Sequence, residues 1–121
     1  MNILIIEDDQ FTLELLQHIV ENLGHKVSVV ENGEEAIKKL VTEKYDLLIS
    51  DIMMPGISGL SLVTVLRTVH INTTPIIMMS SLVNKPMLEA AFKAGANDFI
   101  VKPFTAEDIE KKLKKFDPVK A

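Results

Sequence analysis

The chain has 121 residues, of which 47% are hydrophobic and 25% are charged, and it contains no cysteine. This length suits one domain, spanning residues 1–121 with its own core, and the lack of cysteine excludes disulfides and thiolate chemistry. The net charge of -4 argues against direct nucleic-acid binding, and no apolar stretch approaches the ~20 residues that a membrane helix needs. The N-terminal order, apolar and then acidic, is wrong for a signal peptide, so we expect a cytoplasmic protein without membrane insertion.

Strands and amphipathic helices alternate through the first half of the chain. Ile3–Ile6 is continuously apolar, as expected of a strand covered on both faces, whereas Lys26–Val30 alternates with polar residues like an edge strand. The helix between them has its predicted apolar stripe at Phe11, Leu15, Leu16, Ile19, Val20 and Leu23. Gly24 is placed to end that helix, and Asn32 is placed to cap the next one. The predicted inner face of this second helix is Ala36, Ile37, Leu40 and Val41.

The second half repeats the alternation. We predict strands at Leu47–Ser50, Ile76–Met79 and Phe99–Val101. The predicted helices are Leu60–Val69, a helix opened by Asn84-Lys85-Pro86 and closed by Gly95, and a helix capped by Thr105 with Ile109, Leu113 and Phe116 facing inward. Residues 117–121 are expected to form a frayed tail or the start of a linker. Strands that alternate with helices in this way predict a parallel sheet with right-handed crossovers.

Polar side chains stand where four of the predicted strands end. Glu7-Asp8-Asp9, Asp51, Ser80 and Lys102 each follow or close an apolar run. Ligands of open parallel sheets bind outside the carboxyl ends of the strands, so we expect these residues to share one edge. Two carboxylates at 4 Å repel by roughly 4 kcal/mol at an effective dielectric of 20, and a divalent cation removes that cost. Mg²⁺ takes few protein carboxylates and leaves room for phosphate oxygens.

Simpler explanations exist for each residue of this group. The acids at 7–9 could cap the first helix, which is the role we expect for Asp9, and Ser80 could serve a turn. Lys102 could extend to solvent, although burial beside a strand end favours anionic partners for its ammonium group. A cis peptide bond between Lys102 and Pro103 would help to aim the lysine. No single one of these explanations accounts for the whole group.

The segments ILIIEDD, LLISDIMMPGISG, PIIMMSS and AGANDFIVKPF together resemble the receiver domain of bacterial and archaeal two-component response regulators. The resemblance covers essentially the whole chain, in order and with family-like spacing. It implies a doubly wound (βα)5 α/β fold: a five-stranded parallel sheet of flavodoxin-like order 2-1-3-4-5 with helices on both faces. It also implies that Asp51 is the phosphoacceptor, that Lys102 compensates charge, and that Ser80 and Phe99 are the switch hydroxyl and switch ring.

The same resemblance implies a metal site. Glu7 and Asp8 would hold Mg²⁺, or alternatively Mn²⁺, with Asp8 binding directly and Glu7 through water. The Asp51 carboxylate and the main-chain carbonyl of Met53 would complete the protein ligands.

The implied function is a phosphorylation-dependent switch of a two-component phosphorelay, not an enzyme acting on separate substrates. Asp51 would accept a phosphoryl group from a sensor histidine kinase or phosphotransfer protein, while Mg²⁺ and Lys102 neutralise charge. The phosphoryl group would attract Ser80, and Phe99 would fill the vacated space. That movement changes the face made by the fourth helix, fifth strand and fifth helix. The output domain or target protein is not identified by the sequence.

Three places depart from the commonest family pattern. Ser81 stands where alanine is most frequent, and it would narrow access to the phosphoryl group slightly or add a hydrogen bond. Met53 and Leu82 are apolar at two positions where polar side chains can orient the hydrolytic water, so we expect a long-lived phosphorylated state. Phe99 has no hydroxyl, so its output contacts can only be packing.

Three other functions compete with this interpretation. A phosphatase of the haloacid-dehalogenase type needs a second aspartate two residues after the nucleophile, where this chain has Met53. A scaffolding pseudo-receiver would normally have lost one of the acidic residues or the lysine. A flavin or nucleotide binder would need a Gly-rich or Ser/Thr-rich loop after the first strand, where this chain is acidic.

Overall fold

The computed structural model describes residues 1–54, 56–82 and 84–118. Its strands are β1 Asn2–Ile6, β2 Lys26–Val30, β3 Leu47–Asp51, β4 Ile76–Ser80 and β5 Asp98–Val101. Its helices are α1 Gln10–Asn22, α2 Gly33–Thr42, α3 Gly59–Thr68, α4 Lys85–Ala94 and α5 Ala106–Lys114. Every predicted strand and helix is present, with ends displaced by a residue or two where they differ.

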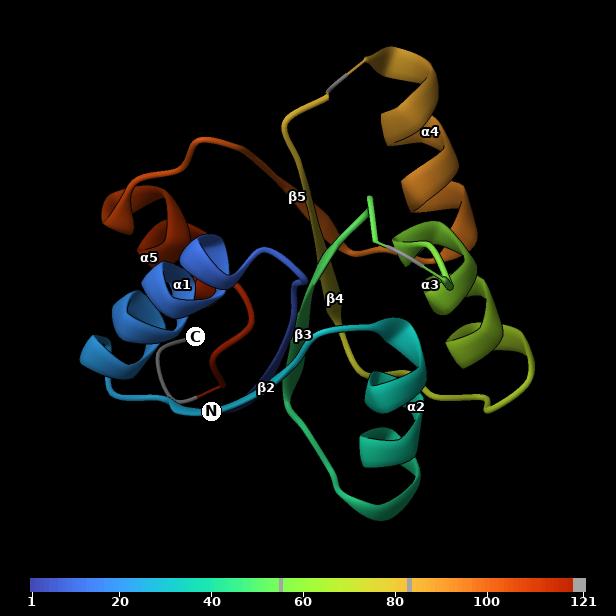
Figure 1. Ribbon diagram of the computed structural model, residues 1–121, viewed down its shortest axis with the longest axis horizontal. Coiled ribbons are helices and arrows are strands. Elements are labelled where there is room, and N and C mark those ends of the chain that lie inside the picture. The colour runs from blue at the N-terminus through green and yellow to red at the C-terminus, as the bar shows by residue number, and fades with distance from the viewer. Residues whose placement is uncertain (55, 83, 119–121) are drawn as a thin grey trace.

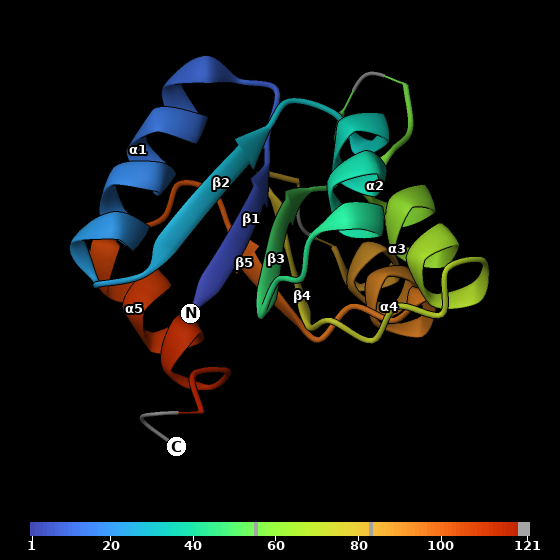
Figure 2. The ribbon, with the colours of Figure 1, turned by 90° about the horizontal axis from the view of Figure 1, so that it is seen from below.

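All strand pairs in the sheet are parallel, and the order is β2-β1-β3-β4-β5. Helices α1 and α5 cover one face, and α2, α3 and α4 cover the other (Figure 1, Figure 2). The flavodoxin-like (βα)5 fold and the edge position of β2 are therefore confirmed.

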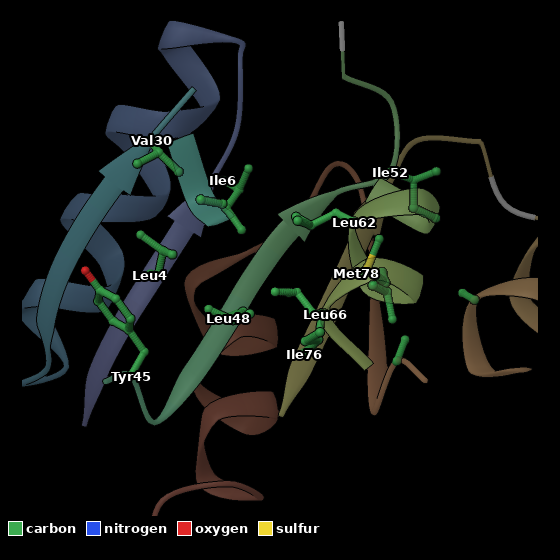
Figure 3. Close-up of a cluster of buried hydrophobic side chains, with 14 of the residues drawn as sticks. Leu4, Ile6, Val30, Tyr45, Leu48, Ile52, Leu62, Leu66, Ile76 and Met78 are labelled. Carbon is green, nitrogen blue, oxygen red and sulfur yellow. The ribbon is translucent and has the colours of Figure 1, made fainter. Parts of the chain in front are cut away.

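The core has two layers because side chains of a strand alternate between the two faces of the sheet. Leu4 and Ile6 of β1 point toward α2–α4, where they join the cluster of Figure 3. Ile3 and Ile5 point the other way and pack with residues of α1 and α5. Since both faces are covered, the central strands β1, β3 and β4 are largely apolar, whereas the edge strand β2 contains Lys26 and Ser28.

Local caps fix where the helices begin and end. The Asp9 carboxylate accepts the Thr12 N–H at the start of α1, and Asn32 accepts the Glu35 N–H at the start of α2. Thr105 and Asp108 form a reciprocal capping box on α5. Gly24, with φ of 92°, and Gly95, with φ of 121°, follow α1 and α4 in a left-handed conformation that favours glycine. These caps agree with the predictions.

The predicted inner faces of α1 and α2 were wrong at three positions. Phe11 is 75% exposed, Leu15 is also exposed, and Val41 is 67% exposed. The buried residues of α1 are Leu13, Leu16 and Val20. At about 100° per residue, Phe11 lies roughly 140–200° around the helix from all three, and Val41 lies roughly 140° from the buried Ala36. The stripe chosen from the sequence was wide enough to include the solvent side.

The expected tail at residues 117–121 lies partly outside the described residues, which end at residue 118. Within them, Asp117 is buried and its N–H donates to the Leu113 carbonyl at 3.1 Å. Phe116 is half-buried and packs with the cluster beneath α1 and α5.

An ion pair joins the start of β5 to α5. Asp98 accepts bonds from Lys112 at 2.8 Å and from Lys115 at 3.2 Å. Burial, the largest effect, raises the pKa of Asp98, but the bonds from Lys112, the Phe99 N–H and Lys115 outweigh it and hold that pKa below its ordinary value. The carboxylate therefore stabilises the fold above the unfolded pKa, and this contribution disappears as pH falls through the folded pKa.

We expect Asp98→Asn to lower the free energy of unfolding by about 1 kcal/mol at pH 7, since the pair is partly buried. The difference from the wild type should shrink as pH falls below the unfolded pKa and should disappear as pH falls through the lower folded pKa of Asp98. Urea unfolding at pH 7 and at pH 3 measures it. A difference that stays constant between pH 7 and pH 3 would contradict this electrostatic origin.

Candidate acidic site

The fold brings the predicted polar residues to one edge of the sheet. Glu7 follows β1, Asp51 ends β3, Ser80 ends β4 and Lys102 follows β5. The registers place Asp51 opposite Met79 and Ser80 opposite Val101, so the carboxyl ends of these strands lie at similar heights. The prediction that these residues gather at the carboxyl edge is confirmed.

Three carboxylates form the centre of this site. Glu7, Asp8 and Asp51 each offer one oxygen, and these oxygens lie within 4.8 Å of one another. Glu7 and Asp51 are buried, whereas Asp8 is exposed. The donors are all hard carboxylate oxygens, which is the chemistry that Mg²⁺ prefers, and the exposed Asp8 leaves one side open to water.

Lys102 bridges the two buried carboxylates. Its Nζ donates to Glu7 Oε2 at 2.8 Å and to Asp51 Oδ2 at 3.0 Å, and its side chain is only 19% exposed. The Lys102–Pro103 peptide bond is cis. The alternative of a lysine extended into solvent is therefore wrong.

The ionisation of Glu7 and Lys102 reflects burial opposed by pairing. Burial, the largest effect, raises the pKa of Glu7, and the nearby Asp51 charge adds to it; bonds from Lys102 and the Asp9 N–H act in the opposite direction. Burial is also the largest effect on Lys102 and lowers its pKa, but the bonds to Glu7 and Asp51 together outweigh it and raise that pKa. Lys102 is therefore a firmly charged ammonium group at neutral pH.

Backbone donors complete the partners of the buried carboxylates. The Met53 N–H donates to Asp51 Oδ1 at 3.2 Å, and the Asp9 N–H donates to Glu7 Oε1 at 3.1 Å. Both oxygens of Glu7 thus already accept a protein donor. Of the three carboxylates, Asp8 is the one exposed to solvent.

Two residues beside the carboxylates were expected to act as a switch. The Ser80 hydroxyl is buried at the end of β4 and accepts the Leu82 N–H at 3.0 Å. Phe99 is buried on β5 and packs in the cluster shared with α3 and α4. The apolar side chains of Met53 and Leu82, each 59% exposed, follow Asp51 and Ser80 by two residues.

Gly59 has a structural role beside the site that the sequence did not reveal. A Cβ on it would fall 2.7 Å from Ile52 Cα and closer still to the Asp51 carbonyl oxygen. Its N–H donates to the Ile52 carbonyl at 2.8 Å, which fastens the start of α3 to the end of β3. The only signal was a glycine eight residues after Asp51, and its meaning depends on this close approach.

Three carboxylates and a bridging lysine at the carboxyl edge of an open parallel sheet define an α/β protein with an acidic cluster of the kind that can hold a metal ion. Among the described residues, no helix is long and apolar enough to cross a membrane.

Comparison with known proteins identifies the family. The response regulator receiver domain profile matches residues 3–114. The chain is 32% identical over 120 residues to the transcriptional regulatory protein CrdR of Helicobacter pylori, covering 97% of this chain and 56% of CrdR. It thus spans about half the length of such curated relatives. The chain belongs to the response regulator receiver domain family, the signalling phosphoacceptor modules of two-component systems.

Solved structures agree with this assignment. The chemotaxis protein CheY4 of Vibrio cholerae superimposes with a TM-score of 0.90 at 26% identity, covering 96% of this chain and 98% of that one. The receiver domain of the sensor histidine kinase PA1611 from Pseudomonas aeruginosa shares the fold at 24% identity, with a TM-score of 0.85 and 95% coverage of both chains. That structure has a magnesium ion coordinated in its active-site cleft. The Glu7, Asp8 and Asp51 cluster of the present chain is consistent with a phosphoacceptor site.

Proposed function

We propose that Asp51 accepts a phosphoryl group from a phosphohistidine of a sensor histidine kinase or phosphotransfer protein. The observation that supports this most directly is the Lys102 bridge between Asp51 and Glu7 inside a three-carboxylate cluster. An Asp51 oxygen attacks phosphorus as the bond to the histidine nitrogen breaks, and the released imidazole takes up a proton. Lys102 neutralises charge on the transferring group and stays bonded to the acceptor carboxylate.

The carboxylates of Asp8 and Asp51 and the main-chain carbonyl of Met53 would hold Mg²⁺, with Mn²⁺ as an alternative ion. Glu7 would contribute through water, because both of its oxygens already accept protein donors. The cation supplies positive charge beside the equatorial oxygens of the transferring phosphoryl group. Lys102 and the Met53 N–H supply the protein's own donors there.

Ser80 and Phe99 are the proposed readout. Among the described residues the Ser80 hydroxyl accepts the Leu82 N–H, and its own proton is still able to donate, so the hydroxyl can turn toward a phosphoryl group on Asp51. Movement at the end of β4 would shift the packing of Phe99, and hence the face made by α4, β5 and α5.

The chemistry of partner docking is also a proposal. Phe11 and Leu15 expose apolar surface on α1, the helix that follows the acidic loop, and suit contact with the helical domain of a kinase.

We further propose that residues 1–121 form one cytoplasmic receiver domain with a tail or linker start at 117–121. Its catalysis is limited to its own phosphoryl transfer and dephosphorylation. Output passes to an attached domain or a separate target, not to nucleic acid bound by this domain.

Incubation with acetyl phosphate and Mg²⁺, followed by intact-mass measurement, tests the central claim. We expect one added phosphoryl group on the wild type, none on Asp51→Asn, and none when the cation is chelated. Asp46→Asn, which alters a carboxylate at the opposite end of β3, is the matched control and should behave like the wild type. Absence of the added mass in the wild type, with acetyl phosphate and with a phosphorylated kinase domain, would favour a scaffolding role.

The phosphorylated state should last well beyond a few seconds. Met53 and Leu82 are both exposed and apolar, so neither can hold a water molecule in line with the phosphorus atom. We expect Met53→Asn and Leu82→Gln to shorten the half-life measured by loss of the added mass, whereas Val69→Asn at the far end of α3 should not. A wild-type half-life of a few seconds would refute this explanation.

A further inference from the structure

The connection between β2 and α2 touches both loops that carry the acidic site. The carbonyl of Val30, the last residue of β2, accepts the Glu7 N–H at 3.1 Å. Three residues later, Gly33 begins α2 and lies against Ile57 of the β3–α3 loop. Figure 2 shows this loop rising beside the N-terminal end of α2. One short segment therefore contacts the loop after β1 and the loop after β3.

The contact between Gly33 and Ile57 is too close for a Cβ at residue 33 unless Ile57 moves by a few tenths of an ångström. A Cβ there would lie 3.2 Å from Ile57 Cβ, 3.4 Å from its Cγ2 and 3.5 Å from its carbonyl oxygen. The φ of Gly33 is not in the left-handed region, and Asn32 already caps the helix. Neither backbone conformation nor capping restricts the residue at position 33. The effect of a Cβ there therefore comes from the approach of Ile57.

Ile57 is linked to Asp51 through a loop that is fastened at both ends. At one end the Met53 N–H donates to Asp51 Oδ1, and at the other the Gly59 N–H donates to the Ile52 carbonyl. Ile57 itself packs on the core cluster under α2 and α3. A displacement of Ile57 by a few tenths of an ångström would act on the same loop that carries Met53.

We infer that Gly33 is a positioning residue whose contact with Ile57 sets the Met53 amide and carbonyl groups relative to Asp51. This inference rests on the proposed function, because its consequence is weaker cation binding and slower phosphoryl transfer when residue 33 carries a Cβ. Gly33 touches neither the cation nor the phosphoryl group. It acts by setting the position of the β3–α3 loop, which carries Met53.

The first test is Gly33→Ala in the full chain. Calorimetric titration with Mg²⁺ should show a Kd raised about threefold to tenfold, and acetyl phosphate labelling should slow by a similar factor, as expected for a small misplacement of site groups. Gly24→Ala is the matched control, because its φ of 92° strains an alanine while no atom lies within 4 Å of the added Cβ. It should lower stability and leave the Kd unchanged.

A double-mutant cycle separates positioning from general damage. Ile57→Gly removes both Cβ and Cγ2, the side-chain atoms that oppose the new Cβ, so Gly33→Ala should have little further effect on the Kd in that background. An unchanged Kd in Gly33→Ala, an equal change in Gly24→Ala, or additive effects in the cycle would each overturn the inference. The amide resonance of Met53 gives a readout without metal, and it should shift in Gly33→Ala. If the wild type bound no Mg²⁺, the proposed function would fail, while the Met53 shift would still decide on the contact.

Discussion

Lys102→Met is expected to lower the free energy of unfolding by about 2–3 kcal/mol at pH 7 without divalent cations. The variant removes the ammonium group that bonds to Glu7 and Asp51, and leaves two buried carboxylates facing each other. Breaking a buried pair by removing one partner costs about 3–5 kcal/mol, and the partial exposure of Lys102 places the effect at or below the lower end of that range. Chelator-treated protein unfolded in urea gives the measurement.

The same variant should respond to cations and to pH in a characteristic way. Mg²⁺ can replace the lost positive charge, so it should stabilise Lys102→Met by more than it stabilises the wild type. Without Lys102, burial and the Asp51 charge raise the pKa of Glu7 without opposition from that bond. A carboxyl whose pKa is raised by folding binds more protons in the folded than in the unfolded protein, so the free energy of unfolding falls as pH rises. The loss caused by Lys102→Met should therefore be larger at pH 8 than at pH 4.5.

Lys112→Met provides the matched control for the Lys102 variant. It also removes a lysine that is paired with a carboxylate, Asp98. Asp98 begins β5, at the opposite end of that strand from Lys102 and the acidic cluster. Its effect should be smaller and independent of Mg²⁺. Equal responses of the two variants to Mg²⁺ would show that the cation does not bind where Lys102 and the three carboxylates meet.

The location of the acidic site could be predicted because it depends on local sequence patterns. The central strands β1, β3 and β4 are covered on both faces and are largely apolar, so the polar residues that close or follow them mark their carboxyl ends. Parallel strands bring those ends together, and Glu7, Asp51 and Lys102 could be grouped without coordinates. Caps such as Asn32 and Thr105 were predictable for the same reason, since their partners lie three residues away.

Features that depend on approach between distant segments could not be predicted. The apolar stripe predicted on α1 was too wide and included Phe11, which is exposed. Helical periodicity shows that one side of a helix is apolar, but it does not show which residue lies at the centre of the buried side. Gly33 looked like an ordinary helix start until Ile57 was found against it. Arg67, the only arginine of the chain, carried no local signal, although it makes the most hydrogen bonds recorded for any side chain among the described residues.

Arg67 joins two connections, α3–β4 and α4–β5, at the edge of the sheet opposite the acidic site. Its Nε and Nη2 donate to the Gly95 carbonyl at 3.2 and 3.0 Å, and its Nη1 donates to the carbonyls of Asn72 and Thr74, both at 2.8 Å. Nη2 also donates to Asn97 Oδ1 at 3.0 Å. Burial lowers the pKa of this guanidinium, and within the described residues no carboxylate lies within ion-pair distance of it. Its charge is balanced by carbonyl and amide oxygens alone.

Arg67→Ala should therefore lower the free energy of unfolding by about 3–4 kcal/mol, because several acceptors lose charged donors, each worth roughly 1.5–3 kcal/mol before relaxation and water entry. Arg67→Lys should recover only part of this, since a lysine offers three donors from one point and cannot reach oxygens spread around a planar fork. Lys93→Ala, on the exposed side of α4, is the control and should change stability by no more than about 0.5 kcal/mol. Urea unfolding of the variants gives these differences.

The measurement that completes this test is phosphorylation at a temperature where Arg67→Ala is still folded. Arg67 ties the start of β4 and β5 to α3, whereas Asp51, Ser80 and Lys102 lie at the opposite ends of their strands. Stability and chemistry should therefore separate: the variant unfolds at lower urea concentration but accepts a phosphoryl group from acetyl phosphate at the wild-type rate. A folded Arg67→Ala that loses its phosphoryl transfer rate would mean that the two edges of the sheet are coupled through α3.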